Sequence, residues 1–290
     1  MRDLSTIGVW THTETMSGAD SIALAQRVES LGYSTLWLPE TAGKDPFVLI
    51  ALLAANTDQL RFATGIANIF HRHPGVMKQA AMTLAEQTGG RFVLGIGVSH
   101  GPMVAGLRGL DYSKPLASMS GYLDGYDASP YMAFPPAEPP QRVLAALGPK
   151  MLELARDKAD GAHPYWTTPE HTALARKILG PDKLLCVEQK VVGTTDAAVA
   201  RAAAANALAM YRNLPNYRNN WLRLGYTDEE IDGNDPRFID AVVAWGTTDA
   251  IAARVNEHID AGATQVCVQP LDPENRLGVV DWSVLEALAP

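Results

Sequence analysis

RFVLGIGV, residues Arg91–Val98, is an apolar run that follows a segment of helically spaced apolar residues, Gly75–Glu86. Similar pairs of a longer helical segment and a short apolar run recur along the chain. A strand that is apolar throughout is typical of a parallel sheet buried on both faces. Strands that alternate with helices predict such a sheet. The run and its repeats therefore predict an α/β fold.

The apolar runs number eight, and each is followed by a predicted helix. They are Ile7–Trp10, Thr35–Leu38, Leu60–Ile66, Arg91–Val98, Arg142–Leu147, Gly161–Tyr165, Leu184–Val192 and Gln265–Pro270. Eight such units favour a closed (β/α)8 TIM barrel, a single domain over residues 1–290, rather than an open doubly wound sheet. Between the seventh and eighth strands lies a helical excursion, Asn213–Trp245, which is a candidate lid or partner surface.

Composition restricts the possible partners. The 290 residues carry a formal net charge of −8, which argues against a nucleic-acid partner because such a partner needs a basic face. No run of about 18 apolar residues predicts a membrane span, and residues 1–5 lack the start of a signal peptide. Cys186 and Cys267 lie in apolar runs, so we expect buried free thiols and a cytoplasmic protein.

Polar and aromatic residues gather at the carboxyl ends of the predicted strands, where a parallel barrel builds its active site. The histidines in these positions are His12, His71, His73, His100, His163 and His171. Trp10 and Trp166 also stand at strand ends, and Glu40 follows the second strand. His258 lies in the middle of a helix and is expected on the surface. The pattern predicts one pocket at this end of the barrel.

Each of these residues also has a purely structural interpretation. His71 and His73 can belong to a loop that caps a helix, and His100 can be a hydrogen-bonded loop residue. Glu40 can face a helix dipole, and His163, inside a strand, favours a core residue. A metal site at the histidine pair is not expected, because no set of carboxylates accompanies it at other strand ends.

Two loops after the fifth and sixth strands suit an anion. Gly148-Pro149-Lys150-Met151 opens a helix with a free backbone amino end, and Tyr165-Trp166-Thr167-Thr168 leads into a second helix capped by threonine. Both are also good helix starts without a ligand, but on neighbouring strands they would hold a phosphate. Gly95-Ile96-Gly97 lacks the third glycine of a dinucleotide fingerprint, since His100 stands there. Those glycines favour close approach of a backbone or a flat ligand.

At this point the chain resembles the bacterial luciferase-like oxidoreductase superfamily, and most closely its branch that uses the deazaflavin coenzyme F420. The resemblance covers nearly the whole chain. It rests on the segments Leu36–Glu40, Leu60–Ile66, Gly90–Gly97, Ala145–Met151 and Ala159–Tyr165.

The resemblance implies roles for particular positions. A non-proline cis peptide at Gly65–Ile66, between Thr64 and Ala67, would bulge under the central ring of the cofactor. Glu40 would touch the pyrimidine side of that ring, and the two anion loops would hold the phosphate. A relative that oxidises a sugar phosphate has His where this chain has Thr41, and Glu where it has His100. These departures argue against sugar-phosphate oxidation and leave the barrel and the cofactor unaffected.

The expected function is hydride transfer between coenzyme F420 and a small organic substrate, which is an alcohol or ketone, an enone, or a quinone-like molecule. His100 is the candidate general acid or base, and Glu40 would position the ring. Trp10, His12, His71 and Trp166 would shape the substrate side. The alternatives are an FMN-dependent monooxygenase on the same barrel and a non-catalytic cofactor-binding protein. A homodimer is expected from the resemblance.

Overall fold

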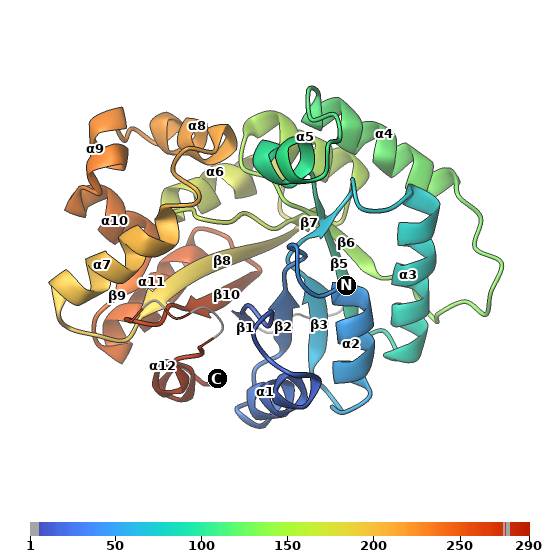
Figure 1. The fold of residues 1–290 in the computed structure, drawn as a ribbon, viewed down its shortest axis with the longest axis horizontal. Helices are drawn as coiled ribbons and strands as arrows, with labels where there is room; N and C mark the ends of the chain where they lie inside the picture. Colours follow the sequence, from blue (N-terminus) through green and yellow to red (C-terminus); the bar gives the residue numbers. More distant parts are fainter. Residues whose placement is uncertain (1–5, 275, 277–278) are drawn as a thin grey trace.

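Eight parallel strands close into a barrel in the computed structural model, which describes residues 6–274, 276 and 279–290 (Figure 1). In sheet order they are β1 (Ile7–Trp10), β2 (Thr35–Leu38), β3 (Arg61–Thr64), β5 (Phe92–Gly97), β6 (Gln141–Leu144), β7 (Gly161–Ala162), β8 (Leu184–Val192) and β10 (Gln265–Pro270). Pairing of β10 with both β8 and β1 completes the ring. The predicted (β/α)8 barrel is confirmed.

Helices cover the outside of the ring. They are α1 (Gly18–Ser30), α2 (Pro46–Ala54), α3 (Pro74–Gln87), α4 (Pro115–Ala128), α5 (Pro149–Lys158), α6 (Pro169–Leu179), α11 (Thr248–Asp260) and α12 (Trp282–Ala287). Side-chain caps fix where several of them start: Asp45 accepts from the first amides of α2, and Thr168 from an amide of α6. Such caps satisfy amides that have no partner inside the helix.

Three predicted strands end two or three residues earlier than the sequence indicates. The fifth, β6, ends at Leu144 rather than Leu147. The third ends at Thr64, and after a cis peptide between Gly65 and Ile66 the chain resumes as β4 (Ala67–Asn68), which pairs with β5. The sixth, β7, holds two residues, so His163 to Tyr165 leave the sheet at its carboxyl end. At the third and sixth strands the run continues past the last strand residue, and only single hydrogen bonds, such as those from the Gly65 and His163 amides, still reach the neighbouring strands; periodicity alone does not show where a strand ends.

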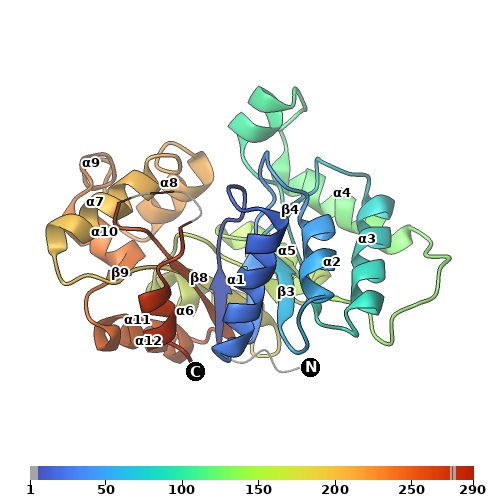
Figure 2. The ribbon, with the colours of Figure 1, turned by 60° about the horizontal axis from the view of Figure 1, so that its bottom comes forward.

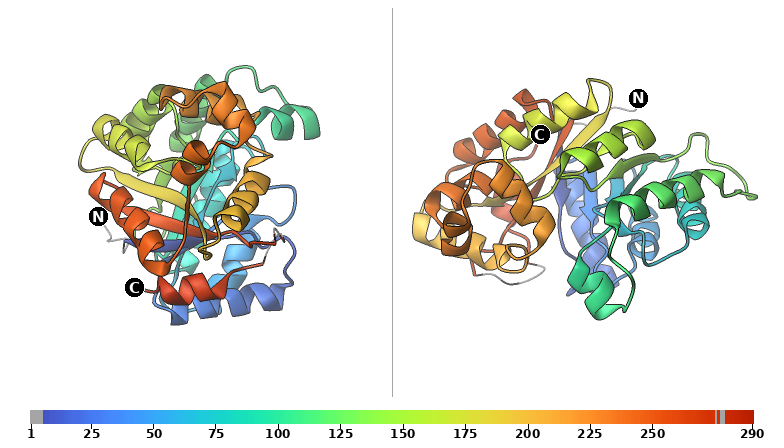
Figure 3. Two further views of the ribbon diagram at one scale, coloured as in Figure 1. Left: turned by 90° about the vertical axis from the view of Figure 1, so that its left-hand side faces the viewer. Right: turned by 90° about the horizontal axis from the view of Figure 1, so that it is seen from above.

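The predicted excursion is helical and stands between β8 and β10. After α7 (Ala197–Leu208) come α8 (Pro215–Arg223), α9 (Asp228–Gly233) and α10 (Pro236–Val242), then β9 (Val243–Trp245), which pairs with β8. A second helical segment, the π-helix η1 (Pro102–Leu107), lies between β5 and α4. Figure 2 shows this segment standing out from the body, and Figure 3 places it at the same end of the barrel as the excursion.

The barrel interior is filled by an apolar cluster distinct from the layer between strands and helices. Its buried members are Trp10, Trp37, Ala63, Val93, Val143, Leu184, Cys186 and Cys267. Both cysteines are free and fully buried, as predicted. No helix in the described part of the chain is long and apolar enough to cross a membrane. The prediction from residues 1–5 lies outside the described residues.

The prediction for His258 is wrong. This histidine on α11 is fully buried between α6 and β8. Its Nδ1 accepts from the Thr172 hydroxyl at 2.8 Å, and its Nε2–H donates to Gln189 Oε1 at 2.8 Å. The two partners come from other elements, so the sequence around the histidine gives no sign of them.

Candidate functional site

The floor of the candidate site lies at the end of β3. The Gly65–Ile66 peptide is cis, as the resemblance implies. The Glu40 backbone amide donates to the Ile66 carbonyl at 3.3 Å, which places the residue after β2 beside this peptide. A side chain at Gly65 would collide with the indole of Trp10, because its Cβ would lie 2.5 Å from Nε1. Only glycine therefore leaves room for the Trp10 indole beside the floor.

The Glu40 carboxylate is held in a tight network beside the floor. Arg72 donates to both of its oxygens, and Nδ1 of His71 lies 3.3 Å from Oε1. The backbone amide of Asn68 donates to Oε2 at 2.6 Å. The His71 ring also meets the Asn68 side chain at 3.1 Å. Arg72, His71 and Asn68 together therefore fix the Glu40 carboxylate beside the floor.

Other predicted residues near the floor are engaged in the barrel itself. The Thr64 hydroxyl donates to the Gly95 carbonyl at 2.6 Å and accepts from its amide at 3.0 Å. Ala67 is fully buried in the layer between strands and helices. Their backbones stay at the strand end, while their side chains fix β3 and β4 in place.

An aromatic wall surrounds the carboxyl end of the barrel. The Trp10 ring lies 4.9 Å from the His12 ring and 5.3 Å from the Tyr165 ring. Tyr211 lies 5.6 Å from Tyr165 and 5.7 Å from Trp166, centroid to centroid. The structure brings the predicted residues Trp10, His12, Tyr165 and Trp166 together. Tyr211, which the sequence did not single out, joins them.

The excursion contributes to the same wall. Tyr217 of α8 lies 5.2 Å from the Tyr211 ring and 5.5 Å from the His100 ring. The Trp221 indole, also on α8, donates to the Trp166 carbonyl at 2.9 Å. These contacts place α8 over the carboxyl end of the barrel, in the position of a lid. Sequence reasoning placed the excursion there as an alternative but could not assign its inner face.

His100 lies at the start of the η1 segment and faces this wall. Its Nδ1 is buried and has no hydrogen-bond partner among the described residues. Burial lowers the pKa of the imidazole to about 4, so the ring is neutral at pH 7. A neutral imidazole can accept a proton but is a poor donor at that pH.

A charged pair inside the barrel is the main feature that sequence reasoning missed. Glu188 and Lys190 of β8 are 0% and 2% exposed, and Lys190 Nζ lies 3.0 Å from Glu188 Oε2. The sequence does carry a sign of this pair, because two charged residues interrupt the apolar run of β8 at alternate positions. Alternate residues share one face of a strand, here the face of Cys186, which belongs to the interior cluster.

The predicted anion loops converge with a residue from the excursion. Gly148 is the N-cap of α5 and offers no side-chain acceptor to the helix start; Met151 donates to the Gly148 carbonyl at 3.1 Å, and Pro149 has no N–H. Arg223 of α8 reaches this glycine: its Nη2 lies 3.8 Å from where a Gly148 Cβ would stand. The hydroxyl of Thr167 is buried without a partner among the described residues. Helix amides, a guanidinium and a free hydroxyl suit a phosphate.

The remaining loop residues take different positions. The Thr168 hydroxyl caps α6, where it accepts from the His171 amide. Lys150 is exposed at the start of α5, next to the half-buried Pro149 and Met151. Among the described residues, no group of three or more His, Cys, Asp or Glu side chains is arranged to hold a metal ion.

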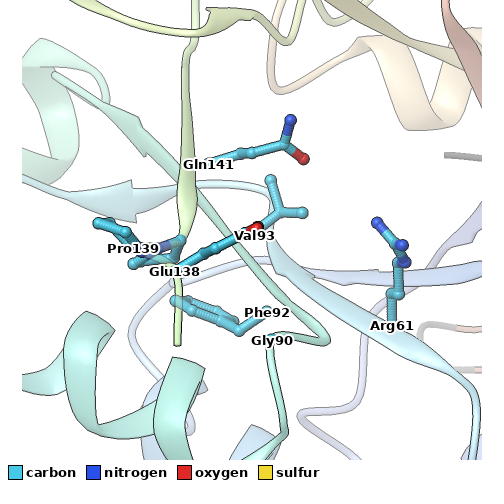
Figure 4. A pocket seen from close by; sticks show the side chains of 8 residues that line it. Arg61, Gly90, Phe92, Val93, Glu138, Pro139 and Gln141 are labelled. Atoms are coloured by element: carbon cyan, nitrogen blue, oxygen red, sulfur yellow. The ribbon is translucent and has the colours of Figure 1, made fainter. Parts of the chain in front are cut away.

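A hollow of about 210 Å³ lies at the opposite end of the barrel (Figure 4). It is lined by Arg61, Phe92 and Gln141, the first residues of β3, β5 and β6. In parallel barrels the amino ends of the strands serve stability and the carboxyl ends serve function. The hollow is therefore distinct from the candidate site.

The geometry defines a (β/α)8-barrel protein with a cluster of aromatic rings at the carboxyl ends of the strands. The chain belongs to the luciferase-like monooxygenase family, whose profile matches residues 2–265. A relative from Mycobacterium tuberculosis, named "Putative coenzyme F420-dependent oxidoreductase", is 25% identical, over 90% of this chain and 93% of the relative.

Solved structures share the fold. An F420-dependent secondary alcohol dehydrogenase in complex with an F420-acetone adduct matches with a TM-score of 0.75 and 14% identity, over 98% of this chain and 99% of that chain. The oxygenating constituent of 3,6-diketocamphane monooxygenase from Pseudomonas putida, in complex with FMN, matches with a TM-score of 0.70 and 16% identity, over 98% and 96%. At this identity the structures support the barrel alone, and they include both cofactor types.

Proposed function

We propose that the protein is an oxidoreductase that uses coenzyme F420 to exchange a hydride with a small organic substrate. The observation that carries the proposal is the approach of the Arg223 guanidinium to Gly148 at the start of α5, and the unpartnered Thr167 hydroxyl on the loop before α6 supports it. A cofactor phosphate there would leave its ring system to lie along the wall. The F420-dependent relative supports the choice of cofactor.

The chain's own residues would divide the work as follows. Gly148, Thr167 and Arg223 bind the phosphate, and Glu40 with its arginine partner holds the floor. When bound, the deazaflavin supplies the hydride chemistry. Trp10, His12, His71 and Trp166 exclude water on the substrate side. His100, with an unpartnered Nδ1, stays the sequence-derived candidate for proton exchange.

The chemistry of the aromatic wall is the basis for the proposed substrate class. Its rings favour a small, largely apolar molecule with one polar oxygen, which fits an alcohol or ketone, an enone, or a quinone-like compound. A charged substrate is not favoured, since the buried Lys190 is already paired with Glu188. A non-catalytic cofactor-binding protein is disfavoured, because unpartnered polar atoms of His100 and Thr167 remain in the site.

Titration with the two cofactors tests the proposal. The purified protein, freed of bound cofactor, is expected to bind F420 at least about tenfold more tightly than FMN, a difference of about 1.4 kcal/mol. F420 fluorescence and the visible spectrum of FMN measure both affinities. Arg223→Ala should weaken F420 binding, whereas Arg156→Ala, which removes an exposed guanidinium outside the site, should not. Tight FMN binding without F420 binding would support the FMN-dependent monooxygenase instead.

A homodimer and a cytoplasmic location stay predictions. On α2, Val48 and Leu52 are 72% and 42% exposed, and residues four apart share one face of a helix. This apolar face is where we expect a second copy to pack. Sedimentation should show a dimer for the native chain and a monomer for Val48→Lys/Leu52→Lys, and a monomeric native chain would contradict the prediction.

A further inference from the structure

Lys190 occupies a cage of aromatic rings inside the barrel. Its Nζ lies 3.5 Å from the centroid of the Tyr165 ring, 3.9 Å from that of Trp166 and 6.0 Å from that of Tyr211. Attraction between an ammonium and ring faces, together with the Glu188 carboxylate, offsets part of the cost of removing this charge from water. The ammonium is therefore fixed at the wall that the proposed substrate would contact.

Glu188 has one oxygen that the protein does not use. Oε2 accepts from Lys190 at 3.0 Å and from the Trp166 amide at 3.3 Å. Oε1 is buried with no hydrogen-bond partner among the described residues. A buried carboxylate oxygen without a donor is costly, and such an orphan in a site calls for a ligand that supplies the missing O–H or N–H.

The neighbours of Glu188 place it in the pocket rather than in the structural core. Its charge acts on Tyr165, Tyr211 and Tyr217 and raises the pKa of each hydroxyl further, beyond the effect of burial. His12, the predicted substrate-side histidine, interacts electrostatically with the same carboxylate. The carboxylate thus lies among the rings of β1, β7 and the excursion, which together form the wall.

We propose that Glu188 is a catalytic base whose free Oε1 takes the proton of a substrate hydroxyl, with Lys190 as the residue that positions it and keeps it ionised. The substrate is then an alcohol, most simply a secondary alcohol, in preference to the enone or quinone-like alternatives. This inference rests on the proposed function, since it needs a bound hydride acceptor.

The step balances with that acceptor. The hydroxyl proton passes to Glu188 Oε1, and the electron pair of the O–H bond becomes the second bond of the product carbonyl. The C–H pair leaves the same carbon as a hydride for the oxidised deazaflavin. In the reverse direction, protonated Glu188 returns the proton to the carbonyl oxygen. General-base assistance of this kind typically contributes about 10²–10⁴-fold in rate.

The pair also sets a pH range. Burial lowers the pKa of Lys190 to about 8, against the opposing effect of Glu188. Above that pH the ammonium loses its proton, and the carboxylate loses its counter-charge in a space otherwise occupied by Tyr165, Tyr211, Tyr217, His12 and Cys267. The neutral lysine holds Glu188 Oε2 less strongly than the ammonium does, so the carboxylate stays ionised but is less firmly positioned toward the substrate hydroxyl. Turnover in the oxidation direction should therefore fall above about pH 8 because this positioning is lost.

The first experiment compares Glu188→Gln with His100→Ala and with Glu153→Gln, a control at an exposed carboxylate of α5. Secondary alcohols from 2-propanol to cyclohexanol are offered with oxidised F420. Glu188→Gln should lower kcat by about 100-fold or more while the Kd for F420 changes less than about threefold. His100→Ala should lower kcat less. Loss of kcat in His100→Ala with wild-type kcat in Glu188→Gln would assign the proton to His100 and overturn the inference.

The second experiment needs no turnover and no cofactor. Carbon-13 NMR of labelled lysine side chains follows Lys190 with pH, and its signal is identified by its loss in Glu188→Gln/Lys190→Met. This double variant removes both charges at nearly constant size, so it keeps the barrel folded where a single change leaves a buried charge unpaired. The Lys190 signal should titrate near pH 8 and at a lower pH in Glu188→Gln. An unshifted lysine titration would show that no buried pair exists.

Failure of the proposed function and failure of the role assigned to Glu188 give different results. If the protein does not bind F420, the proposed function fails. If it binds F420 and reduces enones or quinones but oxidises no alcohol of the panel, the proposed function stands and the assignment of Glu188 is overturned.

Discussion

Gly95→Ala is expected to prevent the barrel from forming a stable fold. A Cβ on Gly95 would lie 1.9 Å from the carbonyl oxygen of Thr64, far inside van der Waals contact. The obstacle is backbone, and the Thr64 hydroxyl ties the same residue to both the amide and the carbonyl of Gly95. Relief of the clash would separate β3 from β5, next to the floor of the site. We expect a loss beyond about 4 kcal/mol, which marginal domains do not survive.

Soluble yield and thermal unfolding by circular dichroism measure this effect. Gly121→Ala is the matched control, because a Cβ at this position in α4 meets no atom within 4 Å. Inside a helix the same change should raise the free energy of unfolding slightly, by about 0.4–1 kcal/mol. A soluble Gly95→Ala protein that unfolds at the temperature of Gly121→Ala would show that β3 and β5 are not as close as described.

The glycines of β5 illustrate what the sequence predicts well. Position 100 holds a histidine where a dinucleotide-binding motif has its third glycine, so the sequence argues against such a site. The close approach of a neighbouring backbone remains as the explanation for Gly95. The structure confirms that reason. The fold followed from the same local evidence, since apolar runs and helical spacing recur at short range along the chain.

The functional site is less predictable because distant segments build it. Tyr217 and Arg223 belong to the excursion, and only tertiary packing of α8 brings them to His100 and Gly148. The pair on β8 is local, but two charges in an apolar run also fit a strand that emerges at the surface. Which way alternate residues point is decided by closure of the barrel, and a single strand does not carry that information.

Acid is expected to destabilise the protein through its buried histidines, and the loss begins near pH 6.5. Burial lowers the pKa of His163 and His171 to about 4 and that of His258 to about 3. In the unfolded chain these imidazoles bind a proton near pH 6.5. Unfolding therefore takes up protons below that pH, and the free energy of unfolding falls as the pH falls from about 6.5 toward 4. Each pH unit in that range costs about 1.4 kcal/mol per histidine.

These three groups, together with His100, whose pKa is also lowered to about 4, are expected to remove about 5 kcal/mol or more between pH 7 and 4.5, which is comparable to the whole stability of many domains. Urea unfolding at a series of pH values measures this slope. His258→Gln should flatten it, because glutamine retains hydrogen-bonding groups toward Thr172 and Gln189 without a group that titrates. His73→Gln, at an exposed histidine, should leave it unchanged.

A carboxylate has the opposite effect on stability with pH, so the pH range of the loss distinguishes a histidine effect from a carboxylate effect. Glu14 has its pKa lowered to about 2 by hydrogen bonds from His12 and Thr41, which outweigh the opposing effect of burial. Its contribution to stability is complete above about pH 4.5 and is lost only as the pH falls toward 2. A loss of stability that begins between pH 6.5 and 5 therefore reports the histidines. If stability stayed level down to pH 4.5, the three imidazoles would have to be accessible to protons in the folded barrel, contrary to their burial.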